Sequence, residues 1–283
     1  MTPESPENLE PFGARLRRAM DARGRLCVGI DPHASLLASW GLSDDVAGLE
    51  RFTYTVVEAL ADRVAVLKPQ SAFFERFGSR GIAVLERAVV DARQAGALVL
   101  MDAKRGDIGS TMAAYAATYL DKDSPLFSDA VTVSPYLGFG SLRPALDAAR
   151  ISGAGVFVLA LTSNPEGAEV QRAATPDGRS LAQVMLDHIA EENRGATPLG
   201  SVGAVVGATL AEAGVELAVN GPLLAPGMGA QGATAADLPR IFGAAVRNVL
   251  PSFSREVLRH GPSVAGLRES AAREAAEVAE SVK

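Results

Sequence analysis

The sequence predicts an α/β protein built as one closed (β/α)8 barrel, a TIM barrel, that occupies residues 1–283 as a single domain. Short β-branched or apolar runs recur along the chain. Each is followed by a turn rich in Gly, Pro or Asp and then by a longer stretch with helical spacing. Such alternation indicates a parallel sheet covered by helices. The length supports closure into a barrel, because about 250 residues is typical of that fold.

The strand pattern recurs eight times, which is the number that closes this barrel. The predicted strands are 26–30, 64–67, 98–101, 130–133, 156–161, 203–206, 223–225 and 245–250. Several are continuously apolar, as expected where helices cover the outside of a barrel and side chains fill its inside. Apolar residues at three- and four-residue spacing predict outer helices at 49–62, 81–95, 141–149 and 181–192.

Three segments are predicted additions to the barrel. Residues 1–10 are a short N-terminal extension. The polar stretch 166–179, interrupted by Pro176 and Gly178, is predicted to be a loop or a small hairpin. The C-terminal residues 266–283 are rich in Ala, Glu and Arg and are predicted to form a surface helix.

The composition argues against several classes of protein. Hydrophobic residues make up 48% of the chain, which is enough apolar side chain for a large core. The net charge of −6 argues against a nucleic-acid partner, because phosphate backbones are bound by an excess of Lys and Arg. The first residues lack the pattern of a secretory signal, and no apolar run approaches the roughly 20 residues that span a bilayer. With the single Cys27 there is no internal disulfide, so we expect a cytoplasmic protein without a membrane partner.

The segment LVLMDAKRGDIGST, residues 98–111, carries charges at the end of a strand that should be buried. Side chains two residues apart on a strand share a face, so Asp102 and Lys104 are expected to point together toward the barrel mouth. Barrel enzymes carry out their chemistry at that C-terminal end. Two other strands also end in a charge, at Lys68 in VAVLKPQ and at Asp31 in CVGIDPH.

Alternating lysines and aspartates at this mouth would keep one another ionised. An ammonium group between carboxylates stays protonated despite partial burial, and a protonated lysine can donate a proton. A lone Asp-x-Lys would be explained more simply as a structural ion pair. Charges at three neighbouring strand ends favour a functional site instead.

A glycine-rich segment, PGMGAQG at 226–232, follows the predicted seventh strand and precedes a helix expected after Thr234. Backbone N–H groups in such a loop suit a phosphate, and the loops after strands seven and eight are the usual phosphate site of these barrels. A simple turn is the alternative interpretation. Arg255 lies just past the predicted eighth strand and can bind phosphate oxygens in a bidentate manner. Arg247 is the competing arginine, but it lies within or before that strand.

At 102–108 the sequence DAKRGDI resembles the Asp-x-Lys-x-x-Asp-Ile signature of the orotidine 5'-phosphate decarboxylases. The resemblance covers nearly the whole chain in matching order and spacing. It includes GIDPH at 29–33, KPQSAFFERFG at 68–78, SPYLG at 134–138, TSNP at 162–165 and APGMGAQG at 225–232. The KPQ-x-A-F-F-E and T-S-N-P forms are similar to the longer-chain, type 2 subgroup, which would explain the added segment after strand five.

The resemblance implies a lyase that converts orotidine 5'-phosphate into uridine 5'-phosphate and CO2, the last step of UMP biosynthesis, without a metal ion or an organic cofactor. Its implied catalytic residues are Asp102, Lys104, Lys68 and Asp107. Lys104 would stabilise and protonate the ring carbon as CO2 departs, and Asp102 would lie beside the departing carboxylate. Lys68 and Asp31 would bind ribose hydroxyl groups and orient the network.

The same resemblance assigns the phosphate and the pyrimidine ring. Gln231 and Arg255 would hold the 5'-phosphate. The phosphate loop would comprise Pro226, Gly227, Gly229 and Gly232. Ser163 would hydrogen-bond the pyrimidine ring, although the role of a helix N-cap explains this serine equally well.

The resemblance also implies a homodimer. In the family, the Asp-Ile-x-x-Thr part of the motif crosses a dimer interface. Asp107, Ile108 and Thr111 would therefore complete the neighbour's site.

Two other functions remain as alternatives. A keto-gulonate phosphate decarboxylase or a hexulose phosphate synthase shares Asp-x-Lys-x-x-Asp but uses Mg2+, and such relatives carry an acidic residue where this chain has Lys68. A non-catalytic sensor of phosphate ligands would be expected to have lost some of these charges. The histidines His33, His188 and His260 lie far apart and show no metal-ligand spacing. Cys27 is expected to be a small core residue.

Overall fold

The computed structural model describes residues 9–282, in which eight parallel strands close into a barrel in sequence order. The strands are β1 (Cys27–Ile30), β2 (Val66–Pro69), β3 (Leu98–Arg105), β4 (Ala130–Val133), β5 (Gly155–Leu161), β6 (Val202–Val206), β7 (Leu223–Pro226) and β8 (Val249–Phe253). β8 closes the barrel by pairing with β1 through Cys27↔Ser252 and Val28↔Phe253. The predicted (β/α)8 fold class is confirmed.

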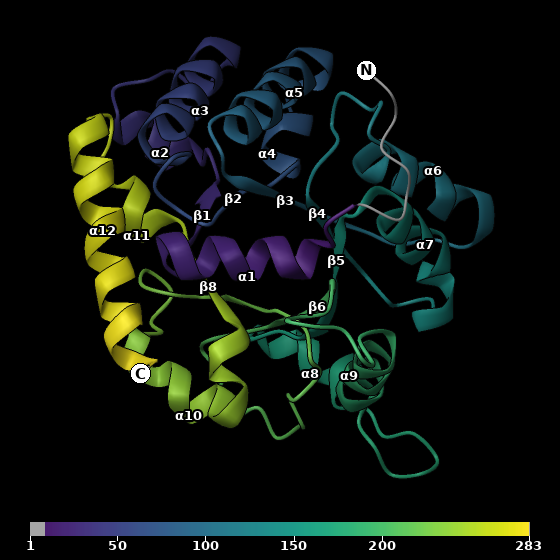
Figure 1. Cartoon of the computed structure of the whole chain (residues 1–283). Helices are drawn as coiled ribbons and strands as arrows, with labels where there is room; N and C mark the ends of the chain where they lie inside the picture. Colours follow the sequence, from purple (N-terminus) through teal and green to yellow (C-terminus); the bar gives the residue numbers. More distant parts are fainter. Residues whose placement is uncertain (1–8, 283) are drawn as a thin grey trace.

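Helices surround the barrel (Figure 1). The longer ones are α1 (Phe12–Arg23), α3 (Val46–Leu60), α5 (Gly78–Gln94), α6 (Gly109–Leu120), α7 (Arg143–Ser152), α9 (Leu181–Glu192) and α12 (Val264–Ser281). The shorter ones are α2 (Ala34–Ser39), α4 (Ala72–Glu75), α8 (Ala168–Gln171), α10 (Leu238–Phe242) and α11 (Arg255–Leu258). Four short segments of 3-10 helix lie in the connections of the described residues: η2 (Phe139–Leu142), η3 (Pro165–Gly167), η4 (Ala235–Asp237) and η5 (Gly243–Asn248).

The first helix, α1, closes the N-terminal end of the barrel. Its apolar face, with Phe12 and Leu16, packs against side chains that fill the inside of the barrel, among them Cys27 and Phe157. The rings of Phe12 and Phe157 meet edge to face with centroids 6.0 Å apart. Cys27 is fully buried, as predicted for a core residue, and this burial raises the pKa of its thiol to about 12.

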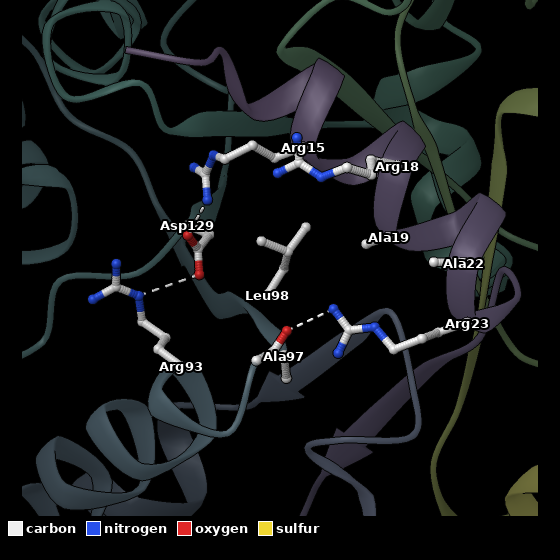
Figure 2. Close-up of a pocket in the computed structure, with 10 residues that line it drawn as sticks. Arg15, Arg18, Ala19, Ala22, Arg23, Arg93, Ala97, Leu98 and Asp129 are labelled. Atoms are coloured by element: carbon white, nitrogen blue, oxygen red, sulfur yellow. Dashed lines mark hydrogen bonds and ion pairs between the residues drawn. The ribbon is translucent and has the colours of Figure 1, made fainter. Parts of the chain in front are cut away.

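Arginines around a hollow of about 440 Å3 fix α1 to this end of the barrel (Figure 2). Asp129, just before β4, is 2% exposed and accepts from Arg15 at 2.5 Å, from Arg93 at 3.3 Å and from the Val99 N–H at 2.9 Å. On the rim, Arg23 donates to the Gly96 carbonyl at 2.6 Å. Each of these arginines has a protein partner, which makes the hollow part of the scaffold.

The eighth strand differs from its prediction. The structure has the 3-10 helix η5 over Gly243–Asn248 and starts β8 only at Val249. The predicted strand 245–250 included the apolar residues 245 and 246, which lie in η5. In the structure Pro251 lies within β8, opposite Ala225. The prediction was wrong because pairing with β1 requires the strand to reach Phe253.

The added segments follow their predictions in part. Residues 166–179 form the short helix α8 and then a turn closed by the antiparallel bridge Ala174↔Ser180, so both helix and hairpin are present. The tail forms α12, but Leu267 and Val278 are buried on its inner face, and only its outer face is solvated. Residues 1–8 of the predicted extension and Lys283 lie outside the described residues. Within residues 9–282, none of the helices has the length and apolarity needed to cross a bilayer.

Candidate active site

A cavity of about 190 Å3 opens at the C-terminal mouth of the barrel. Its lining comes from the ends of seven of the eight strands, all except β4, or from the loops that follow them. Among the lining residues are Asp31, Lys68, Asp102, Lys104, Pro226, Gly227, Gln231 and Arg255. The structure therefore brings together eight of the residues that the sequence assigned to one site.

Asp102 is the centre of the charged network in this cavity. It is 8% exposed, and its Oδ2 accepts from Lys68 Nζ at 3.0 Å while its Oδ1 accepts from Lys104 Nζ at 2.6 Å. Lys68 is 5% exposed, whereas the side chain of Lys104 is 44% exposed. The expectation that Asp102 and Lys104 share one face of β3 is confirmed.

The ionisation of this network follows from the balance between burial and attraction. Burial alone would raise the pKa of Asp102, but the charges of Lys68 and Lys104 and their hydrogen bonds outweigh it and hold that pKa well below its usual range. Burial would likewise lower the pKa of Lys68, but Asp102 and Asp31 outweigh it and hold that pKa above its usual range. The buried pair is therefore charged at neutral pH.

Asp31, at the end of β1, is 7% exposed, and its Oδ1 has no hydrogen-bond partner among the described residues. The hydroxyl of Ser254, just after β8, is also buried without such a partner. Both residues line the cavity. Because buried polar atoms are normally hydrogen-bonded, these two atoms indicate where a bound molecule would supply hydrogen-bonding groups.

The glycine-rich loop follows β7. Gly227, Gly229 and Gly232 have φ angles of 106°, 65° and 105°, a region that residues with a Cβ rarely adopt. Within the loop, the Gly229 N–H donates to the Ala233 carbonyl at 2.8 Å. The helix predicted after Thr234 begins there, with a capping box between Thr234 and Asp237.

The two candidate arginines lie at opposite ends of β8. Arg255 is the first residue of α11 and lines the cavity at the mouth. Arg247 lies in η5, before the strand, where its carbonyl accepts from Arg17 of α1. Arg255 therefore lines the cavity and Arg247 lies away from it, while phosphate binding by Arg255 stays a prediction.

Some predicted residues lie outside this cavity. Asp107, Ile108 and Thr111 stand at the start of α6, where Ile108 is 62% exposed and Asp107 accepts from the Ile108 N–H at 2.7 Å. Their role in a partner's site stays a prediction. Ser163 is exposed next to the lining residue Thr162, and its contact with the pyrimidine ring also stays a prediction.

Several residues of the site were not predicted from the sequence. Gln70 lines the cavity, and its position two residues after Lys68 on a strand could have indicated it. Thr132 on β4 donates to Asp102 and is fully buried. An isolated threonine in an apolar strand carries no signal of such a role, so only the structure identifies it.

The histidines lie apart from the network. His33 packs edge to face on Phe73, with ring centroids 4.4 Å apart, and His188 stacks on Phe139 at 4.8 Å. Among residues 9–282, no group of three or more His, Cys, Asp or Glu side chains is arranged to hold a metal ion.

The fold and this site define a (β/α)8-barrel enzyme with a buried lysine–aspartate network at its mouth. Residues 24–269 match the sequence model of the orotidine 5'-phosphate decarboxylase / HUMPS family, and the chain belongs to that family. This confirms the resemblance found in the sequence.

Similar proteins carry the same family name. The chain is 74% identical to the orotidine 5'-phosphate decarboxylase of Streptomyces coelicolor, over 95% of this chain and 98% of that protein. It is 68% identical to that of Salinispora arenicola, over 94% and 96%. The structure of Leishmania donovani OMP decarboxylase superposes with a TM-score of 0.76 at 29% identity, covering 96% of this chain and 99% of that one. These similarities confirm the predicted enzyme class, a carboxy-lyase.

Proposed function

We propose that the protein decarboxylates orotidine 5'-phosphate to uridine 5'-phosphate and CO2, the last step of UMP biosynthesis, with Lys104 as the proton donor and without a metal or organic cofactor. The observation that carries the proposal is the Lys68–Asp102–Lys104 network inside the cavity at the barrel mouth. The relative at 74% identity is named for this reaction.

The reaction requires a proton at a carbon atom. As the bond between the ring carbon and the carboxylate breaks, CO2 leaves and its bonding electron pair stays on the ring carbon. A nearby ammonium stabilises that charge and then donates the proton that forms the new C–H bond. Lys104 fits this role better than Lys68, because its side chain is 44% exposed toward the mouth whereas Lys68 is buried against Asp102.

Asp102 serves this mechanism in two ways. It is ionised, because two ammonium groups hold its pKa low, and it fixes Lys104 Nζ at 2.6 Å. Its negative charge would lie beside the departing carboxylate and would be relieved as neutral CO2 forms. A positively charged lysine and a negatively charged aspartate side by side would thus favour the transition state over the bound substrate.

The other residues of the site would bind different parts of the substrate: the ribose, the phosphate and the pyrimidine ring. Asp31 Oδ1 would accept from a ribose hydroxyl, which gives this buried atom the partner that the protein does not supply. Gln231, Arg255 and the loop with Pro226 and Gly227 would bind the phosphate. Ser163 would reach the pyrimidine ring. The binding energy of the phosphate, which lies away from the reacting carbon, can then contribute to stabilising the transition state.

We further propose a cytoplasmic homodimer in which Asp107, Ile108 and Thr111 complete the partner's site. The support is that Ile108 is 62% exposed and that Tyr136 and Leu137, after β4, are 76% and 52% exposed. Large apolar side chains at this exposure are typical of a surface that another chain covers.

The direct test is to follow the loss of absorbance of orotidine 5'-phosphate with purified protein, with and without a chelator. Turnover that is unchanged by the chelator is the expected result. Turnover that requires added Mg2+ would support the sugar-phosphate branch of the family instead. Absence of turnover with tight binding of the substrate would support the sensor.

A further inference from the structure

We propose that Thr132 is a positioning residue for the decarboxylation: its hydroxyl holds both the Asp102 carboxylate and the backbone of Lys104 in the arrangement that the reaction uses. This inference rests on the proposed function. Thr132 lies on β4, is fully buried, and does not line the cavity. It therefore acts through its two neighbours.

The hydrogen bonds of Thr132 connect the two charged residues. Its Oγ1 donates to Asp102 Oδ1 at 2.9 Å and accepts from the Lys104 N–H at 3.0 Å. A hydroxyl has one hydrogen to donate and two lone pairs to accept with, so one side chain can satisfy both contacts at once. Asp102 Oδ1 also accepts from Lys104 Nζ, and Thr132 thereby closes a ring through the side chain and the backbone of Lys104.

This ring depends on an irregularity between β3 and β4. Their register runs from Met101↔Val131 to Arg105↔Val133, so that three residues of β3 lie opposite Thr132 alone. Such a bulge removes regular ladder partners and re-aims side chains. The Lys104 N–H, which loses its ladder acceptor there, bonds to the threonine hydroxyl instead.

The backbone of Lys104 shows what the hydroxyl has to hold. Its φ is 49°, a left-handed conformation that is rare for a residue with a side chain, and Asn220 is the one other described residue besides glycines with positive φ. Conformations of this kind persist only where surrounding contacts fix them. The conformation lets Lys104 Nζ turn back to Asp102, two residues earlier.

The geometry leads to a clear expectation for substitutions of Thr132. Valine has nearly the same shape without the hydroxyl, whereas serine retains it. Thr132→Val should lower kcat about 10- to 100-fold, the loss typical of a hydrogen bond to a charged group, with KM changed less than about 2-fold. Thr132→Ser should recover most of that loss.

Thr53→Val is the matched control. Thr53 lies on α3, is also fully buried, and its hydroxyl has no hydrogen-bond partner among the described residues. Its substitution should leave kcat and KM close to those of the wild type. A comparable loss of kcat in Thr53→Val would overturn the specific role of Thr132.

A second measurement does not depend on catalysis. Hydrogen exchange of single backbone amides, read by mass spectrometry with electron-transfer fragmentation, should show faster exchange at Lys104 in Thr132→Val but not in Thr132→Ser. Faster exchange throughout the barrel would mean general destabilisation and would overturn the inference, as would unchanged exchange at Lys104. If the wild-type protein fails to turn over, the proposed function falls, and this exchange comparison still decides whether Thr132 holds Lys104.

Discussion

The two ends of the barrel each contain one buried aspartate between two cationic side chains, yet they are built for different purposes. At the N-terminal end, Asp129 accepts from Arg15, Arg93 and a backbone N–H and joins α1 and α5 to the strands (Figure 2). At the mouth, Asp102 accepts from Lys68 and Lys104 beside a cavity.

What differs is how completely each aspartate cluster is hydrogen-bonded within the protein. The planar guanidinium groups of Arg15 and Arg93 bond to the Asp129 carboxylate, and Arg15 also donates to the Gly153 carbonyl. The mouth uses lysines, whose single nitrogen can exchange a proton, and leaves Asp31 Oδ1 and the Ser254 hydroxyl without partners among the described residues. The cluster at Asp129, whose carboxylate is hydrogen-bonded within the protein, is therefore part of the scaffold. The cluster at the mouth lies beside buried polar atoms without protein partners, which marks it as a candidate binding site.

The largest expected effect is on turnover. Lys104→Ala should lower kcat by at least about 10³-fold, because the proton donor and a charge that stabilises the transition state are both removed. Thermal unfolding should change little, since the side chain is 44% exposed. Steady-state turnover of orotidine 5'-phosphate is the measurement, and Lys122→Ala, a surface lysine, is the control. Full turnover by Lys104→Ala would contradict the proton-donor assignment.

The complementary change at the other end should affect stability instead. Asp129→Asn should lower the free energy of unfolding by about 3 kcal/mol, because two arginines lose the carboxylate they surround. The kcat of the folded protein should remain close to wild type. Denaturant unfolding and turnover at low temperature measure the two effects.

Glu10→Gln provides the control for that experiment, since its pair with Arg18 is exposed and such pairs contribute little. A large loss of kcat in Asp129→Asn without loss of stability would break the distinction between the two ends.

A moderate effect is expected on substrate binding. Arg255→Ala should raise KM about 10- to 100-fold, because a guanidinium that binds a phosphate makes charge-assisted hydrogen bonds. Arg247→Ala, at the opposite end of β8, should leave KM unchanged. The check is a comparison of KM values for orotidine 5'-phosphate. Equal KM values for the two variants would contradict the assignment of Arg255.

The smallest effect is expected from pH. The folded-state pKa of Asp102 lies below 3.8, the ordinary value of an aspartate carboxyl, so its contribution to stability is present above that pH and is lost as pH falls through the folded pKa. The folded-state pKa of Lys68 lies above 10.5, so its contribution is present below that pH and is lost as pH rises through the folded pKa. The 13C shift of the Asp102 carboxyl should therefore stay constant from pH 8 to pH 4. A titration within that window would contradict the charged network.

Much of the site could be predicted because it depends on short-range rules. The two-residue period of a strand placed Asp102 and Lys104 on one face, and the common mouth of parallel strands placed Lys68 and Asp31 beside them. The signature around 102–108 then indicated the family to which the chain belongs. These conclusions needed no knowledge of which side chains from distant segments touch.

The errors and omissions come from long-range pairing. The limits of β8 follow from its pairing with β1, which overrides the local preference of residues 245–250. Asp129 is bonded to Arg93 and Arg15, which lie 36 and 114 positions away from it in the sequence. No local pattern specifies such contacts, because they exist only after the strands have closed.

The sequence by itself determined the barrel, the charged strand ends and the family, because periodicity, burial and motif spacing are properties of neighbouring residues. The tertiary structure alone decided that Asp102 is held between Lys68, Lys104 and Thr132, and that Lys104 adopts a left-handed backbone. The reason is physical: a bulge forms only when two strands are paired, and the bulge in β3 takes the Lys104 N–H out of the regular ladder, where it bonds to the hydroxyl of a buried threonine.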